Sequence, residues 1–289
     1  RGKNTEIKAN GHADIFRDHT GKWWAVSLGI RCISYPFKHN LGRETMLMPV
    51  IWEENSWPVI ATDGVLEESY EAPSFTDETW LKSIPQKNLA GTKEFFDDFE
   101  EDTLHPSWNF IYCPQKVTFG NGRGLELTSN KNLLSSKNGA SFLGRRQEHH
   151  CFHAITKVCL PMEQEGEEAG LTIYLNHRHH YEIALAYLED KKYIISRRQI
   201  GSLSSITHKI SIPKNEITLK LEGTKELYTF SYSLDGNHFI KLEEGETAYL
   251  TTEVGGMFTG NYIGLYSVQN DVAKDCTATF RYFKYTAKD

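Results

Sequence analysis

The chain has 289 residues, which predicts either one large β domain or two domains. Apolar residues make up 39% and charged residues 24%, a mixture that is typical of a soluble globular protein and excludes intrinsic disorder. The apolar runs are short, so the sequence predicts no transmembrane helix. The net charge of −6 provides no basic field, and we expect neither a nucleic-acid partner nor a membrane partner.

The first 93 residues show a short series of predicted strands followed by a loop. Lys22–Arg31 alternates in a pattern with two fairly apolar faces, which predicts a strand buried on both sides. Met46–Trp52 and Trp57–Ile60 flank the polar turn Glu53–Ser56 and predict a β-hairpin. From Leu66 to Lys93 the alternation fades among proline, glycine and polar residues, which predicts a loop or linker.

From Glu94 onward, short strands separated by turns rich in Gly, Asn and Asp predict an antiparallel β-sandwich, and no segment has a convincing helical period longer than about ten residues. The main predicted strands are Phe95–Phe99, Leu125–Thr128, Ser141–Arg145, His153–Leu160, Ala169–Leu175, Tyr181–Tyr187, Tyr193–Gln199, Ile217–Leu221, Tyr228–Leu234, Tyr262–Ser267 and Thr277–Thr286. Aromatic residues make up 12% of the chain, a richness that favours strands and accompanies sugar-binding surfaces, because rings stack on the apolar faces of pyranoses.

The five cysteines form neither a disulfide framework nor a zinc-ribbon pattern. Their number is odd, no CxxC occurs and the spacings fit no zinc ribbon. We therefore predict buried free thiols at Cys32, Cys113, Cys151, Cys159 and Cys276.

A set of short motifs follows one another along the chain, and each alone is a weak signal. The motifs are GHAD at 11–14, G-x-WW at 21–24, LGRET at 41–45, W-x-x-x-x-WPV at 52–59, FLGRRQ at 142–147, YSLDG at 232–236 and GGMFTG at 255–260. In this order they resemble the C-terminal half of glycoside hydrolase family 43. The members that they resemble most are β-xylosidases with or without α-L-arabinofuranosidase activity.

The resemblance implies an all-β fold: a partial five-bladed β-propeller, contributing its final blade strands at 1–85, a linker at 86–93, and a concanavalin-like antiparallel β-sandwich, or jelly roll, at 94–289. It implies an inverting enzyme that removes xylose or arabinose from the non-reducing end of xylo- or arabino-oligosaccharides. Inversion needs an acid and a base roughly 6.5–9.5 Å apart. In the family this Asp base and Glu acid precede the GHAD motif, so we expect no catalytic residue in this chain, and no hydrolysis by this chain alone.

The resemblance also assigns roles to individual residues. Arg43 of LGRET is implied to contact sugar hydroxyls or the catalytic carboxylates, and Phe258 is implied to help wall the sugar pocket. His12 of GHAD is implied to bind a metal ion such as calcium, or an ordered water, near the propeller axis, and no cofactor is required. Asp14 and Glu44 match neither the acid nor the base and are predicted to be structural. From the residues alone, Arg43 would be an inter-strand ion pair, while His12 and Phe258 would be core residues.

Several other features remain open. The His149–His153 and His177–His180 clusters could hold a metal, although exposed or loop histidines are the simpler prediction. Arg145-Arg146 and Arg197-Arg198 are predicted to be strand pairs with one exposed member, or residues at a pocket rim, and Asp97–Asp102 a solvated edge.

The rival hypothesis for the whole chain is a non-catalytic carbohydrate-binding or structural β-sandwich module, because similar sandwiches serve lectins and enzyme appendages alike. The sequence begins at Arg1 without an initiator methionine or a signal-peptide pattern, so we expect a removed segment or a piece of a longer protein. The compartment stays unknown, and a homo-oligomer is compatible with the resemblance.

Overall fold

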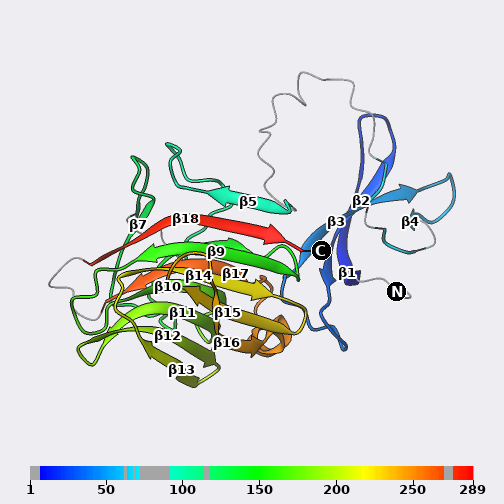
Figure 1. Ribbon diagram of the computed structural model, residues 1–289. Coiled ribbons are helices and arrows are strands. Elements are labelled where there is room, and N and C mark those ends of the chain that lie inside the picture. Colours follow the sequence, from blue (N-terminus) through cyan, green and yellow to red (C-terminus); the bar gives the residue numbers. More distant parts are fainter. Residues whose placement is uncertain are drawn as a thin grey trace. The chain divides into compact units, whose positions relative to one another are not determined.

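The structure, a computed structural model, describes residues 7–61, 64–67, 69–71, 92–112, 117–269 and 276–288. The chain divides into two compact units, Arg1–Asn88 and Leu89–Asp289 (Figure 1). In the described ranges strands dominate, and the two helices, η1 (Thr247–Leu250) and α2 (Thr252–Gly255), have four residues each. The all-β prediction is confirmed, whereas residues 86–91 of the predicted linker lie outside the described residues. Neither short helix has the length or the apolar character needed to span a bilayer.

The first unit is one antiparallel sheet whose strands follow one another in chain order: β1 (Ile7–Arg17), β2 (Trp23–Arg31), β3 (Glu44–Ile51) and β4 (Val59–Ile60). A four-stranded antiparallel sheet is the unit from which propeller blades are made. Its buried apolar cluster is small, consisting of Ala25, Met48, Val50 and Ala61. The described residues of this unit form a single sheet, and few of its side chains are buried.

The predicted hairpin between β3 and β4 is present. Ile51 pairs with Val59, and the backbone N–H of Ser56 donates to the carbonyl of Glu53 at 3.2 Å. Asn55 takes a positive φ of 61°, a conformation that asparagine tolerates better than most residues. The polar residues of this turn therefore predicted the hairpin correctly.

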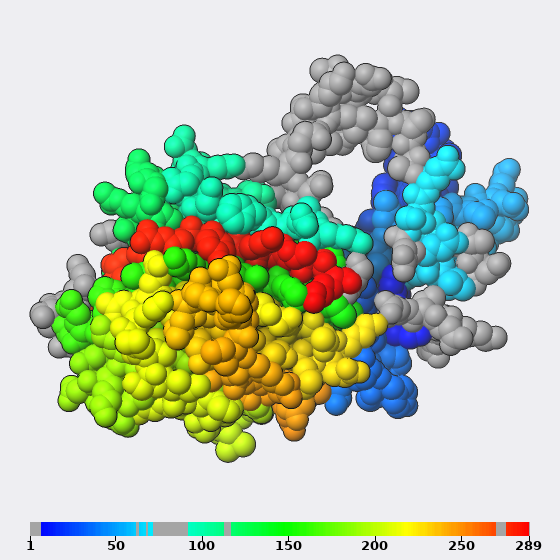
Figure 2. All heavy atoms as spheres, viewed as in Figure 1, coloured from blue at the N-terminus to red at the C-terminus, as the bar shows by residue number. Residues whose placement is uncertain are grey.

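The second unit is a sandwich of two antiparallel sheets (Figure 1). The six-stranded sheet has the order β13 (Leu203–Ser211), β12 (Lys191–Ile200), β11 (His179–Leu188), β10 (Glu168–Asn176), β17 (Tyr262–Val268) and β8 (Ser141–Arg146). The eight-stranded sheet has the order β16 (Ile240–Glu246), β15 (Leu227–Ser233), β14 (Glu216–Gly223), β9 (Phe152–Cys159), β18 (Thr277–Ala287), β7 (Leu125–Thr128) and β6 (Val117–Thr118), and β5 (Glu94–Asp97) also pairs with β18. Figure 2 shows β18, in red, next to β5, in agreement with this pairing.

The main core lies between the two sheets. Alternate residues of a strand point to opposite faces, and on β9 these residues alternate between buried and half-buried along the whole strand. The six-stranded sheet contributes aliphatic side chains such as Leu171, Ile183 and Leu265, and the eight-stranded sheet contributes Val158 and Leu219. These side chains are fully buried, so this interior supplies the hydrophobic stabilisation of the unit.

The six-stranded sheet is also covered on its other face. Phe142, Tyr174, Ala184 and Tyr266 alternate with the core residues of their strands and belong to a second buried cluster. All nine residues of β10 are therefore buried, which a sheet with one solvated face would not allow. This second covered face holds the polar network described below.

Four strands, β1, β6 (Val117–Thr118), β13 and β16, were not predicted. Most residues of β13 are exposed, and its sequence LSSITHKIS does not alternate cleanly between apolar and polar residues. β13 and β16 are strands because their backbones pair with β12 and β15 at the ends of the two sheets. Strand formation at an edge follows from an available hydrogen-bonding neighbour more than from the side chains of the strand itself.

Candidate functional site

In the LGRET motif each residue has a distinct environment. Leu41 is buried, and Gly42 takes a φ of 80°, which glycine adopts without strain. Arg43 directly precedes β3 and is exposed, whereas the carboxylate of Glu44 receives two hydrogen bonds from Arg31, both at 2.8 Å. Glu44 is structural, as predicted, and the motif fixes the backbone on both sides of an outward-facing Arg43.

The GHAD motif lies in an irregular part of β1. The pairing of β1 with β2 shifts register on both sides of Gly11, and His12 has a φ of 56°. Such bulges re-aim side chains. His12 and Asp14 are both exposed.

A metal at His12 requires more ligands than this motif supplies. No group of three or more His, Cys, Asp or Glu side chains suited to a metal occurs among the residues that the structure describes. Calcium takes six to eight oxygen ligands, so one imidazole nitrogen does not form a calcium site. The described residues therefore do not fit a protein-bound calcium ion at His12.

The G-x-WW motif is fixed by the carboxylate of Asp18. This side chain accepts hydrogen bonds from the backbone N–H groups of Thr20 and Lys22 and from the indole N–H of Trp24, the last at 2.7 Å. Desolvation raises the pKa of Asp18, but the hydrogen bonds outweigh it and lower the pKa from 3.8 to about 2. Asp18 thus closes the turn between β1 and β2 and orients the motif tryptophan.

In the second unit, the loop after α2 presents apolar side chains to solvent. Met257 is 56% and Phe258 65% exposed, and Tyr249 and Val254 nearby are exposed as well. Met257 has a φ of 82°, which is rare for a residue with a side chain. The environment of Phe258 therefore differs from that of an ordinary core residue, which was the alternative for this position.

The β10–β11 turn holds this loop in place. The side-chain amide of Asn176 donates to the carbonyl of Gly255 at 3.0 Å, and His179 Nδ1 lies 3.1 Å from the carbonyl of Tyr249. A Cβ atom at Gly255 would lie 2.4 Å from a methyl group of Leu175, so this close approach requires glycine. The segment that precedes Phe258 is thus held by the β10–β11 turn, and Phe258 lies on the exposed loop that follows.

A network of buried charged groups lies on the covered outer face of the six-stranded sheet. Arg197 Nη1 contacts Glu168 Oε1 at 2.8 Å and Glu182 Oε2 at 2.5 Å. The hydroxyl of Tyr266 donates to the same two carboxylates at 2.5 and 3.0 Å. His180 Nε2 lies 3.0 Å from Glu182 Oε1, so four strands contribute to one cluster.

The electrostatics of this network favour an ionised Glu182. Burial alone raises the pKa of Glu182, but Arg197 and His180 outweigh it and lower the pKa from 4.5 to about 2. Burial lowers the pKa of Arg197, and the two carboxylates more than reverse this effect. Both carboxylates are occupied by internal partners, so the network is suited to fixing strand register rather than to proton transfer.

We predict that acid weakens the sandwich through Glu182. Because the pKa of Glu182 is lower in the folded chain than its usual 4.5, its stabilisation is complete above pH 4.5 and is lost as pH falls through about 2. The free energy of unfolding, measured by urea titration between pH 7 and pH 2, should therefore fall less steeply with acid in Glu182→Gln. The exposed control Glu165→Gln should keep the wild-type slope, and equal slopes in all three proteins would contradict the prediction.

Two expectations from the sequence need correction. His179 and His180 are buried on β11 rather than exposed or in a loop, whereas His150 does lie in a loop, between β8 and β9, where it is buried. Arg197 and Arg198 are both half-buried in ion pairs, Arg198 with Glu243, so neither is the exposed member of its pair.

The cysteine prediction was correct in part. The four described cysteines carry thiols rather than disulfides, but only Cys276 is buried, while Cys32, Cys151 and Cys159 are half-buried. Cys113 lies outside the described residues. Cys276 differs from the others because it packs into the core between the two sheets.

Residues 96–286 match the family described as beta xylosidase C-terminal concanavalin A-like domain. Over 98% of this chain, the non-reducing end alpha-L-arabinofuranosidase BoGH43B of Bacteroides ovatus is 32% identical, and the match covers 52% of that protein. A xylosidase/arabinosidase of Butyrivibrio fibrisolvens is 26% identical over 98% of this chain and 53% of its own length. The chain thus spans about half the length of these curated relatives.

Comparison with solved structures shows the same similarity to glycoside hydrolase family 43 proteins. The GH43B protein of a Bacteroides ovatus xyloglucan locus superposes with a TM-score of 0.84 at 30% identity, over 98% of this chain and 55% of that one. The GH43 protein BlXynB of Bacillus licheniformis gives 0.85 at 25% identity, over 99% of this chain and 55% of that one. The family match extends over about two thirds of the sequence and falls on the two-sheet sandwich. The chain therefore belongs to the glycoside hydrolase family 43 group that carries the β-xylosidase C-terminal concanavalin A-like domain.

Proposed function

We propose that this chain is the C-terminal part of an inverting glycoside hydrolase that releases xylose or arabinose from the non-reducing ends of xylo- or arabino-oligosaccharides. The observation that carries the proposal is the extent of the similarity. An arabinofuranosidase aligns at 32% identity with 98% of this chain, so the four-stranded sheet and the sandwich are both included. A free-standing sandwich module would not need the first unit, which favours the enzyme over the binding-module hypothesis.

The general acid and general base belong, in this proposal, to chain outside these 289 residues. The buried carboxylates of the second unit are held by Arg197 and Tyr266, which makes them unsuitable as an acid and base pair that must exchange protons with substrate. The protein partner in the proposal is accordingly the remaining part of the catalytic propeller.

Arg43 is proposed to bind the sugar or the catalytic carboxylates. A guanidinium has a rigid fork of donors that meets two acceptors at once. Exposure of Arg43 next to the anchored Leu41 and Glu44 supports this role, because the side chain is directed away from the small core of its own sheet.

Phe258 is proposed independently as an aromatic contact for sugar. Its 65% exposure at the end of an anchored loop supports the role, since an aromatic face is most useful to a sugar when it is both accessible and held. His12 is proposed to bind an ordered water. Any cation at this position would complete its coordination shell with water. No step of the proposed reaction depends on that ion.

We predict that the 289-residue chain alone releases no pentose. Incubation with p-nitrophenyl β-xyloside, p-nitrophenyl α-arabinofuranoside and xylotriose should give product at the buffer background, because the acid and base are absent. The longer protein that contains this chain is the positive control. Turnover by the isolated chain above the background, retained in a second independent preparation, would contradict the proposal.

A further inference from the structure

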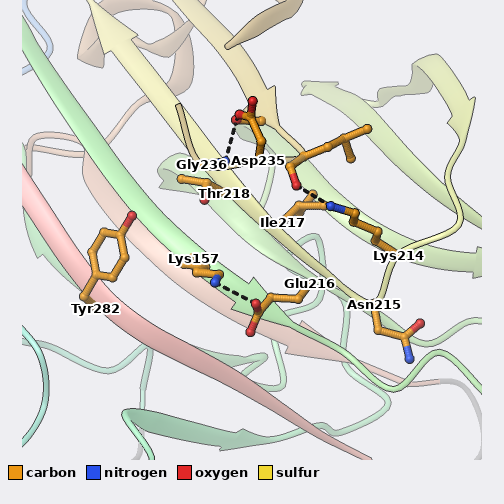
Figure 3. Close-up of a pocket in the computed structure, with 11 residues that line it drawn as sticks. Lys157, Lys214, Asn215, Glu216, Ile217, Thr218, Asp235, Gly236 and Tyr282 are labelled. Atoms are coloured by element: carbon orange, nitrogen blue, oxygen red, sulfur yellow. Dashed lines mark hydrogen bonds and ion pairs between the residues drawn. The ribbon is translucent and has the colours of Figure 1, made fainter. Parts of the chain in front are cut away.

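An open pocket of about 520 Å³ lies on the outer face of the eight-stranded sheet (Figure 3). Val158 of β9 and Ile217 of β14 point into the core, so Lys157 and Glu216, one position away on each strand, point outward. These two side chains are directed toward each other in Figure 3 and form an ion pair of 2.7 Å. The pocket belongs to the sandwich alone and contains neither Arg43 nor Phe258.

A β-bulge in β18 supplies an aromatic wall. The pairing of β18 with β9 shifts register between Phe280 and Phe283, which are both fully buried in the core. Of the two residues between them, Arg281 is exposed and Tyr282 lines the pocket, while Thr156 donates a hydrogen bond to the Tyr282 carbonyl at 2.7 Å. Bulges commonly re-aim side chains in this way.

Tyr282 continues into an exposed aromatic surface. Its ring and that of Phe96 on β5 have centroids 6.0 Å apart and an interplanar angle of 27°. Phe96 is 60% exposed and lies on β5. Two nearly parallel rings thus adjoin a pocket lined by hydroxyl, amide and charged groups.

The charged residues that line the pocket balance one another and are engaged. Lys214 Nζ donates to the carbonyl of Leu234 at 2.6 Å, and Lys157 pairs with Glu216. The carboxylate of Asp235 accepts hydrogen bonds from the hydroxyl of Ser233 and from backbone N–H groups of the following turn. An ionic ligand of either sign would have to displace these contacts, whereas a neutral hydroxylated ligand can add to them.

We propose that this surface is a binding site for a neutral oligosaccharide. The apolar face of a sugar ring lies on Phe96 and Tyr282, and its hydroxyls bond with Glu216 and Asp235 at the pocket. The site requires no hydrolysis. In an enzyme of the proposed function it holds a polymer or a long oligosaccharide close to the catalytic unit, which raises the local substrate concentration.

The test is a titration of the 289-residue chain with xylohexaose, cellohexaose and hexagalacturonate, followed by ¹H–¹⁵N NMR up to about 10 mM ligand. We expect saturable binding of at least one neutral probe, with shifts in β14, β15 and β18. Phe96→Ala and Tyr282→Ala should each weaken it by about tenfold, as for other aromatic contacts at the centre of a binding site. Tyr112→Ala, which removes an exposed aromatic of the second unit outside this pocket, should bind as the wild type does.

The folding of each variant is checked by thermal unfolding, because Tyr282 is half-buried and its replacement could destabilise the chain. If Tyr282→Ala unfolds, the exposed Phe96→Ala serves in its place. No binding of a neutral probe, unchanged affinity in Phe96→Ala, or tighter binding of hexagalacturonate than of both neutral probes would overturn the proposal. Any of these results would leave the assay of pentose release unaffected, so this site and the proposed enzyme activity fail separately.

Discussion

In the full-length enzyme of the proposed function, Arg43→Ala should lower kcat/KM for pentose oligosaccharides by about 10²–10³, the effect of removing a positioned donor from an active site. The free energy of unfolding should change by less than about 0.5 kcal/mol, as for other exposed positions. Arg43 is exposed, and the neighbouring ion pair between Arg31 and Glu44 remains in the variant. The measurement is steady-state kinetics with xylotriose together with thermal unfolding.

Two further variants separate binding from packing. Arg43→Lys keeps the charge but loses the planar fork of donors, so it should recover only part of the activity. Arg31→Ala removes the ion pair with Glu44 and should affect stability more than kcat/KM. A wild-type kcat/KM in Arg43→Ala, or a loss fully explained by unfolding, would remove Arg43 from the proposed sugar pocket.

The second large effect is expected in the sandwich. Arg197→Ala should destabilise it by about 3–5 kcal/mol, because Glu168 and Glu182 would remain buried without their common cation. Both carboxylates are nearly inaccessible to water, so solvent does not replace the missing partner. The measurement is the urea midpoint of the 289-residue chain at pH 7, where both carboxylates of the unfolded chain are ionised.

The matched control is Lys209→Ala, which removes an ion pair of 2.7 Å with the exposed Glu189 and should leave the midpoint unchanged. Replacing Glu168, Glu182 and Arg197 together by apolar residues should recover much of the loss, since the cost arises from uncompensated charge rather than from the missing contacts. A midpoint shift in Arg197→Ala no larger than that of the control would show that water or rearrangement compensates the two carboxylates.

Much of the fold could be predicted from short stretches of sequence. The alternation of β9 and β14 and the polar turn between β3 and β4 specified strands and hairpins, because side chains of a strand point alternately to its two faces whatever their neighbours are. The motifs also indicated that Glu44 is structural, in agreement with its two hydrogen bonds from Arg31. By contrast, β13 was not predicted, because its side chains do not alternate cleanly between apolar and polar residues. It is a strand because its backbone pairs with β12.

The sequence by itself therefore determined the class of the fold, the order of most strands and the family, because these depend on local periodicity and on ordered motifs. Only the tertiary structure decided which polar residues meet. Tyr266 and Glu168 are 98 positions apart, and the contact of their side chains follows from the pairing of β10 with β17. The bulge that turns Tyr282 outward is likewise a matter of register between β18 and β9, which no single segment encodes. Burial of the second face of the six-stranded sheet has the same origin, since a strand specifies two faces but not what covers them.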